Sequence, residues 1–116
     1  MKLVRIMHPG LYESGRWFKL SLEEQLANIG ADVGRAIQSR AKGDAQASIY
    51  AFERALELID FTIDDTKNRK RLKEVVRVRE FLTDYFVGNN QYGFTDKAWQ
   101  DYFYYFGYIA ALNRGK

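Results

Sequence analysis

The sequence predicts an all-α protein, an up-down antiparallel four-helix bundle that follows a short N-terminal arm. Three observations lead to this prediction. Apolar residues recur at intervals of three and four in successive segments, which is the spacing of amphipathic helices. The chain holds a single proline, and most of its glycines fall at natural breaks between those segments. The connections are short, so neighbouring helices are expected to run antiparallel.

The first two expected helices have clear start signals. Ser21 and Glu24 form a capping box, in which each side chain satisfies a free backbone N–H of the other residue, and Lys42-Gly43 ends this helix. Its apolar stripe consists of Leu22, Leu26, Ile29, Val33 and Ile37. Asp44 suits the N-cap of the second helix. The stripe of the second helix, with the 3-4-3-4 spacing of bundle cores, consists of Ile49, Phe52, Leu56, Ile59 and Ile63.

The third helix is expected to begin at Asp65 or Thr66 and to stop at Gly88. Its apolar positions are Leu72, Val75, Val78, Leu82, Tyr85 and Phe86. A turn-rich loop over residues 88–93 follows, and Thr95 or Asp96 caps a fourth helix that runs to about Asn113. Residues 1–20 lack helical periodicity and are expected to form the arm, whereas residues 21–116 are expected to form a single domain.

Length and composition restrict the class of protein. A chain of 116 residues with 47% hydrophobic content can fold as one domain that buries roughly two thirds of its unfolded surface. The absence of cysteine excludes disulfides and thiol chemistry and fits a reducing cytosol. The start of the chain offers no signal-peptide core, and the longest uncharged stretch, residues 102–113, is shorter than the ~20 residues of a membrane helix. We therefore expect a soluble, cytoplasmic protein without a membrane partner.

No pattern of residues indicates an enzyme. His8 is the only histidine, which rules out any catalytic or metal-binding arrangement that needs two. The glycine-rich phosphate loop, the Gly-x-Ser-x-Gly elbow and the His-Glu-x-x-His zinc motif are all absent from the sequence. The sequence therefore predicts a non-enzymatic protein with no catalytic residues, no metal and no cofactor.

A run of basic residues is the sharpest chemical feature. Four cations share the polar face of the third expected helix and could contact phosphate or nucleic acid: Arg69, Lys70, Lys73 and Arg77. The competing interpretation is internal pairing with the acidic stripe of the second helix, formed by Glu53, Glu57, Asp60 and Asp64. The net charge of +3 is mild, so we favour internal pairing or plain solvation over nucleic-acid binding.

Two arginines and two glycines stand out on the expected helices. Arg79 falls inside the apolar stripe of the third helix, and Arg40 is placed similarly near the end of the first, so each is a candidate buried charge. Either arginine could mark an anion pocket, but an ion pair or a side chain that reaches the surface is the favoured interpretation. Gly30 and Gly34 lie on one flank of the first helix and indicate close packing of another backbone.

Aromatic residues are concentrated between Phe81 and Tyr108. The core face of the fourth helix is expected to hold Trp99, Tyr102, Phe103, Phe106, Ile109 and Ala110. Large side chains that fall off the core stripes form a candidate oligomer interface: Tyr50, Leu58, Phe61, Tyr104, Tyr105, Tyr108 and Leu112. Stacking platforms for single-stranded nucleic acid are the alternative, and we favour the interface because tyrosine is enriched at protein contacts.

The segments Trp17–Ile37, Ala55–Ile63 and Arg71–Glu74 resemble a family of small uncharacterised prokaryotic all-helical proteins, a resemblance that implies the fold and no function. The chain also resembles the HEPN bundles, small helical proteins that partner nucleotidyltransferases or cut RNA. Their RNase motif is an arginine followed after four to six residues by histidine. The corresponding positions after Arg79 hold Asp84, Tyr85 and Phe86, so this resemblance implies a catalytically silent relative.

Together these observations predict a non-enzymatic homo-oligomer that acts through protein–protein contacts. The alternative is an RNA- or anion-binding accessory protein, HEPN-like and catalytically silent, that uses the basic face of the third helix.

Overall fold

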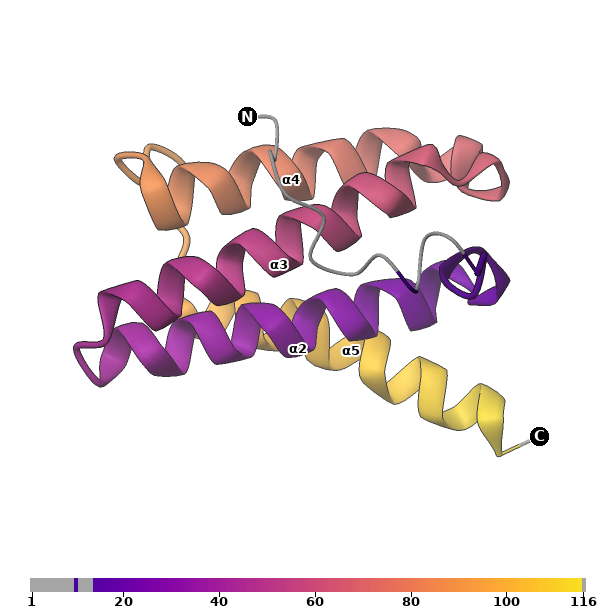
Figure 1. Ribbon diagram of the computed structural model, residues 1–116, viewed down its shortest axis with the longest axis horizontal. Coiled ribbons are helices and arrows are strands. Elements are labelled where there is room, and N and C mark those ends of the chain that lie inside the picture. Colours follow the sequence, from indigo (N-terminus) through magenta and orange to yellow (C-terminus); the bar gives the residue numbers. More distant parts are fainter. Residues whose placement is uncertain (1–9, 11–13, 116) are drawn as a thin grey trace.

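The computed structural model describes Gly10 and residues 14–115. Every regular element within these residues is a helix, so the predicted all-α class is confirmed. Two short 3₁₀ helices, η1 and η2, accompany the α-helices. In chain order the elements are η1 (Trp17–Lys19), α2 (Leu22–Ala41), α3 (Ala45–Asp64), η2 (Thr66–Arg71), α4 (Leu72–Val87) and α5 (Asp96–Arg114), as Figure 1 shows.

Helix α2 packs against α3 on one side and against α5 on the other, while α4 packs against the far side of α3. Successive helices run in alternating directions along the long axis of the molecule (Figure 1). The core between them is built mainly from Leu26, Ile29, Phe52, Leu56, Ile59 and Leu82, all of which are fully buried. Because α4 and α5 lie on different neighbours, long side chains rather than close backbones connect them.

The predicted helix starts are confirmed where a side chain caps the backbone. Ser21 Oγ accepts from the backbone N–H of Glu24 at 3.1 Å, and the Glu24 carboxylate accepts from that of Ser21 at 3.0 Å, which completes the capping box. Asp44 accepts from Ala47 N at 3.1 Å to start α3, and Thr95 accepts from Ala98 N at the same distance to start α5. Each bond satisfies one N–H group that the first turn of a helix leaves unpaired.

The third predicted helix is broken, and this corrects the sequence analysis. Residues 66–71 form η2, and the α-helix begins only at Leu72. The cause is Asn68, whose buried side-chain amide donates to Gln25 Oε1 at 2.8 Å and to the Thr62 carbonyl at 3.1 Å. These bonds pull Asn68 into the protein, away from the outward direction that a continuous polar face would require. Two of the basic residues, Arg69 and Lys70, therefore lie on η2.

The segment before α2 is more structured than an arm. Trp17, on η1, is almost completely buried, and its indole N–H donates to Thr62 Oγ1 at 3.1 Å. The Gln25 side-chain amide donates both to the Trp17 carbonyl at 3.0 Å and to Asp65 Oδ2 at 2.9 Å. A network of hydrogen bonds thus fixes η1 on the core, which the aperiodic sequence of residues 1–20 did not reveal. His8 lies outside the described residues.

Helix α3 is buried over a wider arc than its stripe predicted. Leu58 and Phe61 are only 4% and 7% exposed and belong to the core. Their assignment to an oligomer interface is therefore wrong. Conversely Ile49, which the 3-4-3-4 spacing placed in the core, lies near the start of α3 and is exposed.

Candidate interaction surface

The outer side of α5 carries the most exposed aromatic side chains of the described residues. Tyr104, Tyr105, Tyr108 and Leu112 are 75%, 57%, 55% and 48% exposed, and we call these four residues the tyrosine face. All four were predicted interface residues. The structure brings them together on one helix, because their spacing of three and four places them on neighbouring turns.

The opposite side of α5 explains why this face is exposed. Trp99, Phe103, Phe106 and Ala110 are buried. The rings of Trp99 and Phe103 are stacked with centroids 5.9 Å apart, an offset geometry that stabilises aromatic pairs. A helix with large rings on both sides can bury only one side against α2. The side of α5 that faces away from α2 stays in solvent, and this side is the tyrosine face.

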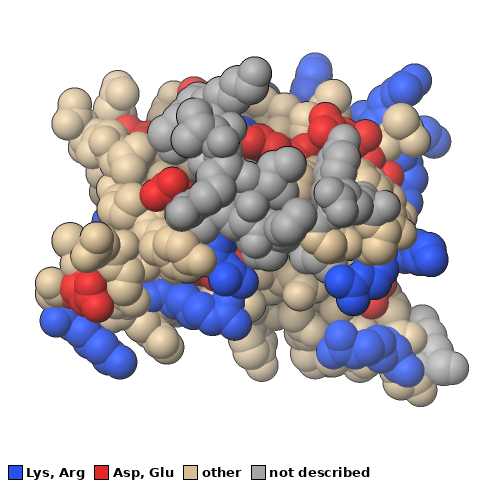
Figure 2. Space-filling model, viewed as in Figure 1, with Lys and Arg blue, Asp and Glu red and all other residues tan. Residues whose placement is uncertain are grey.

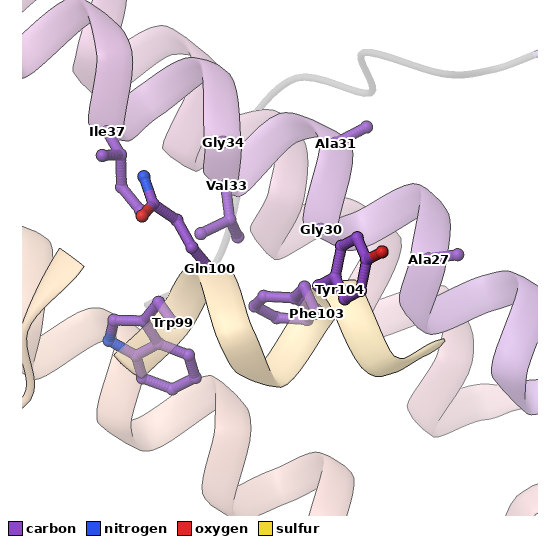
Figure 3. Close-up of a pocket in the computed structure, with 10 residues that line it drawn as sticks. All are labelled: Ala27, Gly30, Ala31, Val33, Gly34, Ile37, Trp99, Gln100, Phe103 and Tyr104. Carbon is purple, nitrogen blue, oxygen red and sulfur yellow. The ribbon is translucent and has the colours of Figure 1, made fainter. Parts of the chain in front are cut away.

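A recess of about 280 Å³ adjoins the tyrosine face between α2 and α5. Its α2 wall is made of small residues, Ala27, Gly30, Ala31 and Gly34 among them. Figure 3 shows Gln100, Phe103 and Tyr104 of α5 on the other wall, with Tyr104 beside Gly30. The two glycines differ: a Cβ at Gly30 would lie 2.5 Å from Phe103 Cβ, whereas a Cβ at Gly34 would meet nothing within 4 Å. Close packing is therefore found at Gly30, and Gly34 leaves the recess open.

Tyr50, the remaining predicted interface residue, does not join this surface. It is exposed, but it lines a separate recess on the α3 flank of α2, together with Arg35 and Arg54. The carboxylate of Asp32 lies at the bottom of that recess, 3% exposed, with Arg35 Nη1 at 2.6 Å and Arg54 Nε at 3.5 Å. No pattern in the sequence predicted this cluster. The spacing of three between Asp32 and Arg35 was its only local signal, because the other arginine comes from α3.

The four predicted phosphate contacts are all exposed. Arg69 and Lys70 lie on η2, and Lys73 and Arg77 on α4. Figure 2 shows lysine and arginine side chains gathered at the end of the molecule where η2 lies in Figure 1. In the described part of the chain, none of these four cations makes an ion pair.

These cations do not pair with the acidic stripe of α3, so of the two favoured interpretations internal pairing is wrong and plain solvation describes the four side chains. The stripe meets α4 at a different residue, since Asp60 Oδ1 accepts from Arg79 Nε at 2.7 Å. Glu57, which the prediction also placed in this seam, is buried. The register between α3 and α4 therefore pairs Asp60 with Arg79 and leaves the basic face of η2 and α4 in solvent.

The two candidate buried charges have different surroundings. Arg79 is partly buried and ion-paired with Asp60, as the favoured interpretation predicted. Arg40 is exposed, so its assignment as a buried charge is wrong. Its guanidinium carbon lies 4.5 Å from the ring centroid of Tyr85 and 4.7 Å from that of Phe86, a cation–π arrangement. Its Nη2 is 3.3 Å from Asp96 Oδ1.

Tyrosines on the inner sides of α4 and α5 donate to carboxylates. Tyr85 donates to Asp96, and burial together with this hydrogen bond raises the pKa of Tyr85 to about 12. Tyr102 donates to Glu74 Oε2 at 2.8 Å, and burial followed by that bond raises the pKa of Tyr102 as well. Both phenols therefore stay protonated at neutral pH and connect α4 to α5 as donors.

The described residues contain no group of three or more histidine, aspartate or glutamate side chains arranged to hold a metal ion. None of the described helices is long and apolar enough to cross a membrane. Comparison of the chain with protein-family models, with curated proteins and with solved structures found no match. The resemblances seen in the sequence therefore stay predictions.

Proposed function

We propose that the protein is a non-enzymatic interaction protein that assembles with copies of itself through the tyrosine face of α5. The observation that carries this proposal is the exposure of Tyr104, Tyr105, Tyr108 and Leu112 on a single helix. Monomers rarely leave a contiguous patch of this kind in solvent, and tyrosine is among the residues enriched at protein interfaces.

The recess beside the tyrosine face supports a symmetric assembly. A two-fold interface brings the same patch of both copies together, so it needs a projection and a matching hollow on one surface. Tyr104 is the projection, and the open space at Gly34 is the hollow. Charge does not oppose the contact, because the two charged residues on the same side of α5 form an ion pair. Lys97 Nζ lies 2.7 Å from Asp101 Oδ2.

We further infer that α2 to α5 form an up-down antiparallel bundle, because each helix reverses the direction of the one before it (Figure 1). In this arrangement α5 is an outer helix with one side on α2 and the other available to a partner. We expect such an assembly to occur in the cytoplasm, in line with the lack of cysteine.

Cysteine cross-linking tests where copies meet, and the chain offers a clean background because it contains no cysteine. We would make Tyr105→Cys, Tyr108→Cys and Leu112→Cys singly and oxidise each at micromolar concentration. A two-fold axis through the tyrosine face should bring at least one pair of cysteines within disulfide reach, which requires Cα atoms less than about 7 Å apart.

Tyr92→Cys is the matched control, because Tyr92 is an exposed tyrosine of the loop before α5 rather than of its face. The proposal expects rapid disulfide-linked dimer from a face variant and only slow, random cross-linking from the control. Equal slow rates at all four positions would count against a symmetric contact at this face.

A second function is favoured by the basic face of η2 and α4. Arg69, Lys70, Lys73 and Arg77 are exposed and make no ion pair in the described part of the chain, so they are available to phosphates. If they bind single-stranded RNA, affinity should fall with salt at a slope of about −0.7 per phosphate contacted. Replacing one of them by glutamine should make the salt dependence shallower by about 0.7, the contribution of one phosphate contact. A fluorescence-anisotropy titration that shows no binding at low salt would remove this candidate.

A further inference from the structure

A groove between α4 and α5 carries an inference that is independent of self-association. The groove has a volume of about 380 Å³, in the range of small-molecule sites. Its walls are mainly apolar, with Val78 and Phe81 from α4, Phe94 from the loop, and Ala98 and Trp99 from α5. It exists because α4 packs on α3 whereas α5 packs on α2, so no backbone fills the space between α4 and α5.

The two charged residues at the groove differ in whether their charge is already paired. Glu74 is occupied, because its Oε1 accepts from Arg71 Nη2 at 2.8 Å and its Oε2 accepts from the Tyr102 hydroxyl at 2.8 Å. Arg77 lines the same groove, is exposed, and makes no ion pair with any carboxylate of the described residues. The charge that is available to a ligand in the groove is therefore positive.

Trp99 contributes an apolar ring to one wall rather than a hydrogen-bond donor. Trp99 is almost completely buried, and its indole N–H has no hydrogen-bond partner among the described residues. Because the indole nitrogen is itself buried, a ligand in the groove would contact the ring of Trp99 and not its N–H.

We propose that this groove binds a small amphipathic anion, an aromatic or short aliphatic carboxylate or sulfonate. The apolar body lies against Phe81, Phe94 and Trp99, and the anionic group binds the Arg77 guanidinium. A guanidinium binds a carboxylate or sulfonate through charge-assisted hydrogen bonds, which are roughly twice as strong as neutral ones. The tyrosine face has no residue in the groove, so either proposal can fail without the other.

Two fluorescent probes separate the role of charge from that of apolar contact. The anion 8-anilinonaphthalene-1-sulfonate and neutral N-phenyl-1-naphthylamine share one ring system and differ by the sulfonate. Both should bind the full chain with one probe per chain, and both should accept excitation energy from Trp99. Part of this energy transfer should be lost in Trp99→Phe, and the remainder should come from Trp17, the other tryptophan of a molecule whose longest extent is 38 Å.

Arg77→Gln should weaken binding of the sulfonate about tenfold, the usual effect of losing one charge-assisted bond, and leave the neutral probe unchanged. Arg69→Gln, which removes another exposed cation that lies outside the groove, should change neither affinity. If Arg77→Gln leaves the sulfonate affinity unaltered, or lowers both affinities equally, the anion site is refuted.

Ala98→Phe fills the groove and should abolish binding of both probes while circular dichroism stays helical. A folded Ala98→Phe protein that binds the sulfonate as the unmodified chain does would place the site elsewhere and overturn the proposal. If that variant does not fold, the unmodified ¹⁵N-labelled chain decides the matter. Adding the sulfonate should shift the amide signals of Val78 and Ala98, and shifts confined to the tyrosine face would refute the groove.

Discussion

The Cα of Gly30 in α2 lies against Phe103 in α5 so closely that a Cβ would approach Phe103 Cβ to 2.5 Å and its Cγ to 2.9 Å. The atoms that would collide belong to the base of the Phe103 side chain, which cannot move without moving α5. This contact sets the distance between α2 and α5. It thereby also sets the shape of the recess beside the tyrosine face.

Gly30→Ala should destabilise the protein by about 1–3 kcal/mol, the usual cost of overpacking, although alanine favours helix over glycine. Gly34→Ala should instead stabilise it by about 0.5–1 kcal/mol, because its new methyl group meets no atom within 4 Å and the helical propensity improves. Urea unfolding followed by circular dichroism measures both. Equal effects of the two substitutions would contradict the close packing at Gly30.

Gln25→Leu should lower the free energy of unfolding by about 1–3 kcal/mol, because it keeps the side-chain volume and leaves buried polar partners unsatisfied. The buried Gln25 amide donates to the Trp17 carbonyl and to Asp65, and its oxygen accepts from Asn68. Gln38→Leu, at an exposed position of the same helix, should change stability by less than about 0.5 kcal/mol. Chemical denaturation of the two variants side by side tests whether the network stabilises the fold.

Asp65→Asn should make stability less dependent on pH in acid. Burial by itself raises the pKa of Asp65, but hydrogen bonds from Lys67 and Gln25 outweigh it and hold that pKa below its ordinary value of 3.8. The ionised carboxylate therefore stabilises the folded chain at neutral pH, and this contribution is lost as the pH falls below 3.8 and through the lower folded pKa.

The measurement for Asp65 is urea unfolding at several values between about pH 5 and pH 2, where this contribution disappears. Asp65→Asn should be less stable than the unmodified protein at neutral pH and should approach it in acid. Asp64→Asn, an exposed neighbour, serves as the control and should follow the unmodified protein throughout. If the free energy of unfolding changes with pH in the same way for all three proteins, the Asp65 carboxylate does not stabilise the fold as proposed.

The sequence was sufficient for features that depend on neighbours in the chain. The capping box at Ser21, the caps at Asp44 and Thr95, and the exposure of the tyrosine face all follow from local spacing. These features need only a helix and its period, which a pattern of residues specifies directly.

Features that join distant parts of the chain could not be predicted in this way. The break at η2 depends on Asn68 reaching Gln25, which is far away in sequence. The pairing of Arg79 with Asp60 depends on the register of α4 on α3, which no single helix contains. The groove between α4 and α5 is a result of which helices become neighbours, and neither helix alone shows that a space is left between them.

Sedimentation equilibrium over a range of concentrations into the tens of micromolar is the most direct test of self-association through the tyrosine face. We predict that the average mass of the unmodified chain rises above 13.6 kDa and approaches twice that value. The folded triple variant Tyr104→Ser, Tyr108→Ser, Leu112→Ser should remain at 13.6 kDa, whereas Tyr92→Ser should associate as the unmodified chain does. An unmodified chain that stays at 13.6 kDa across the whole range would contradict the account.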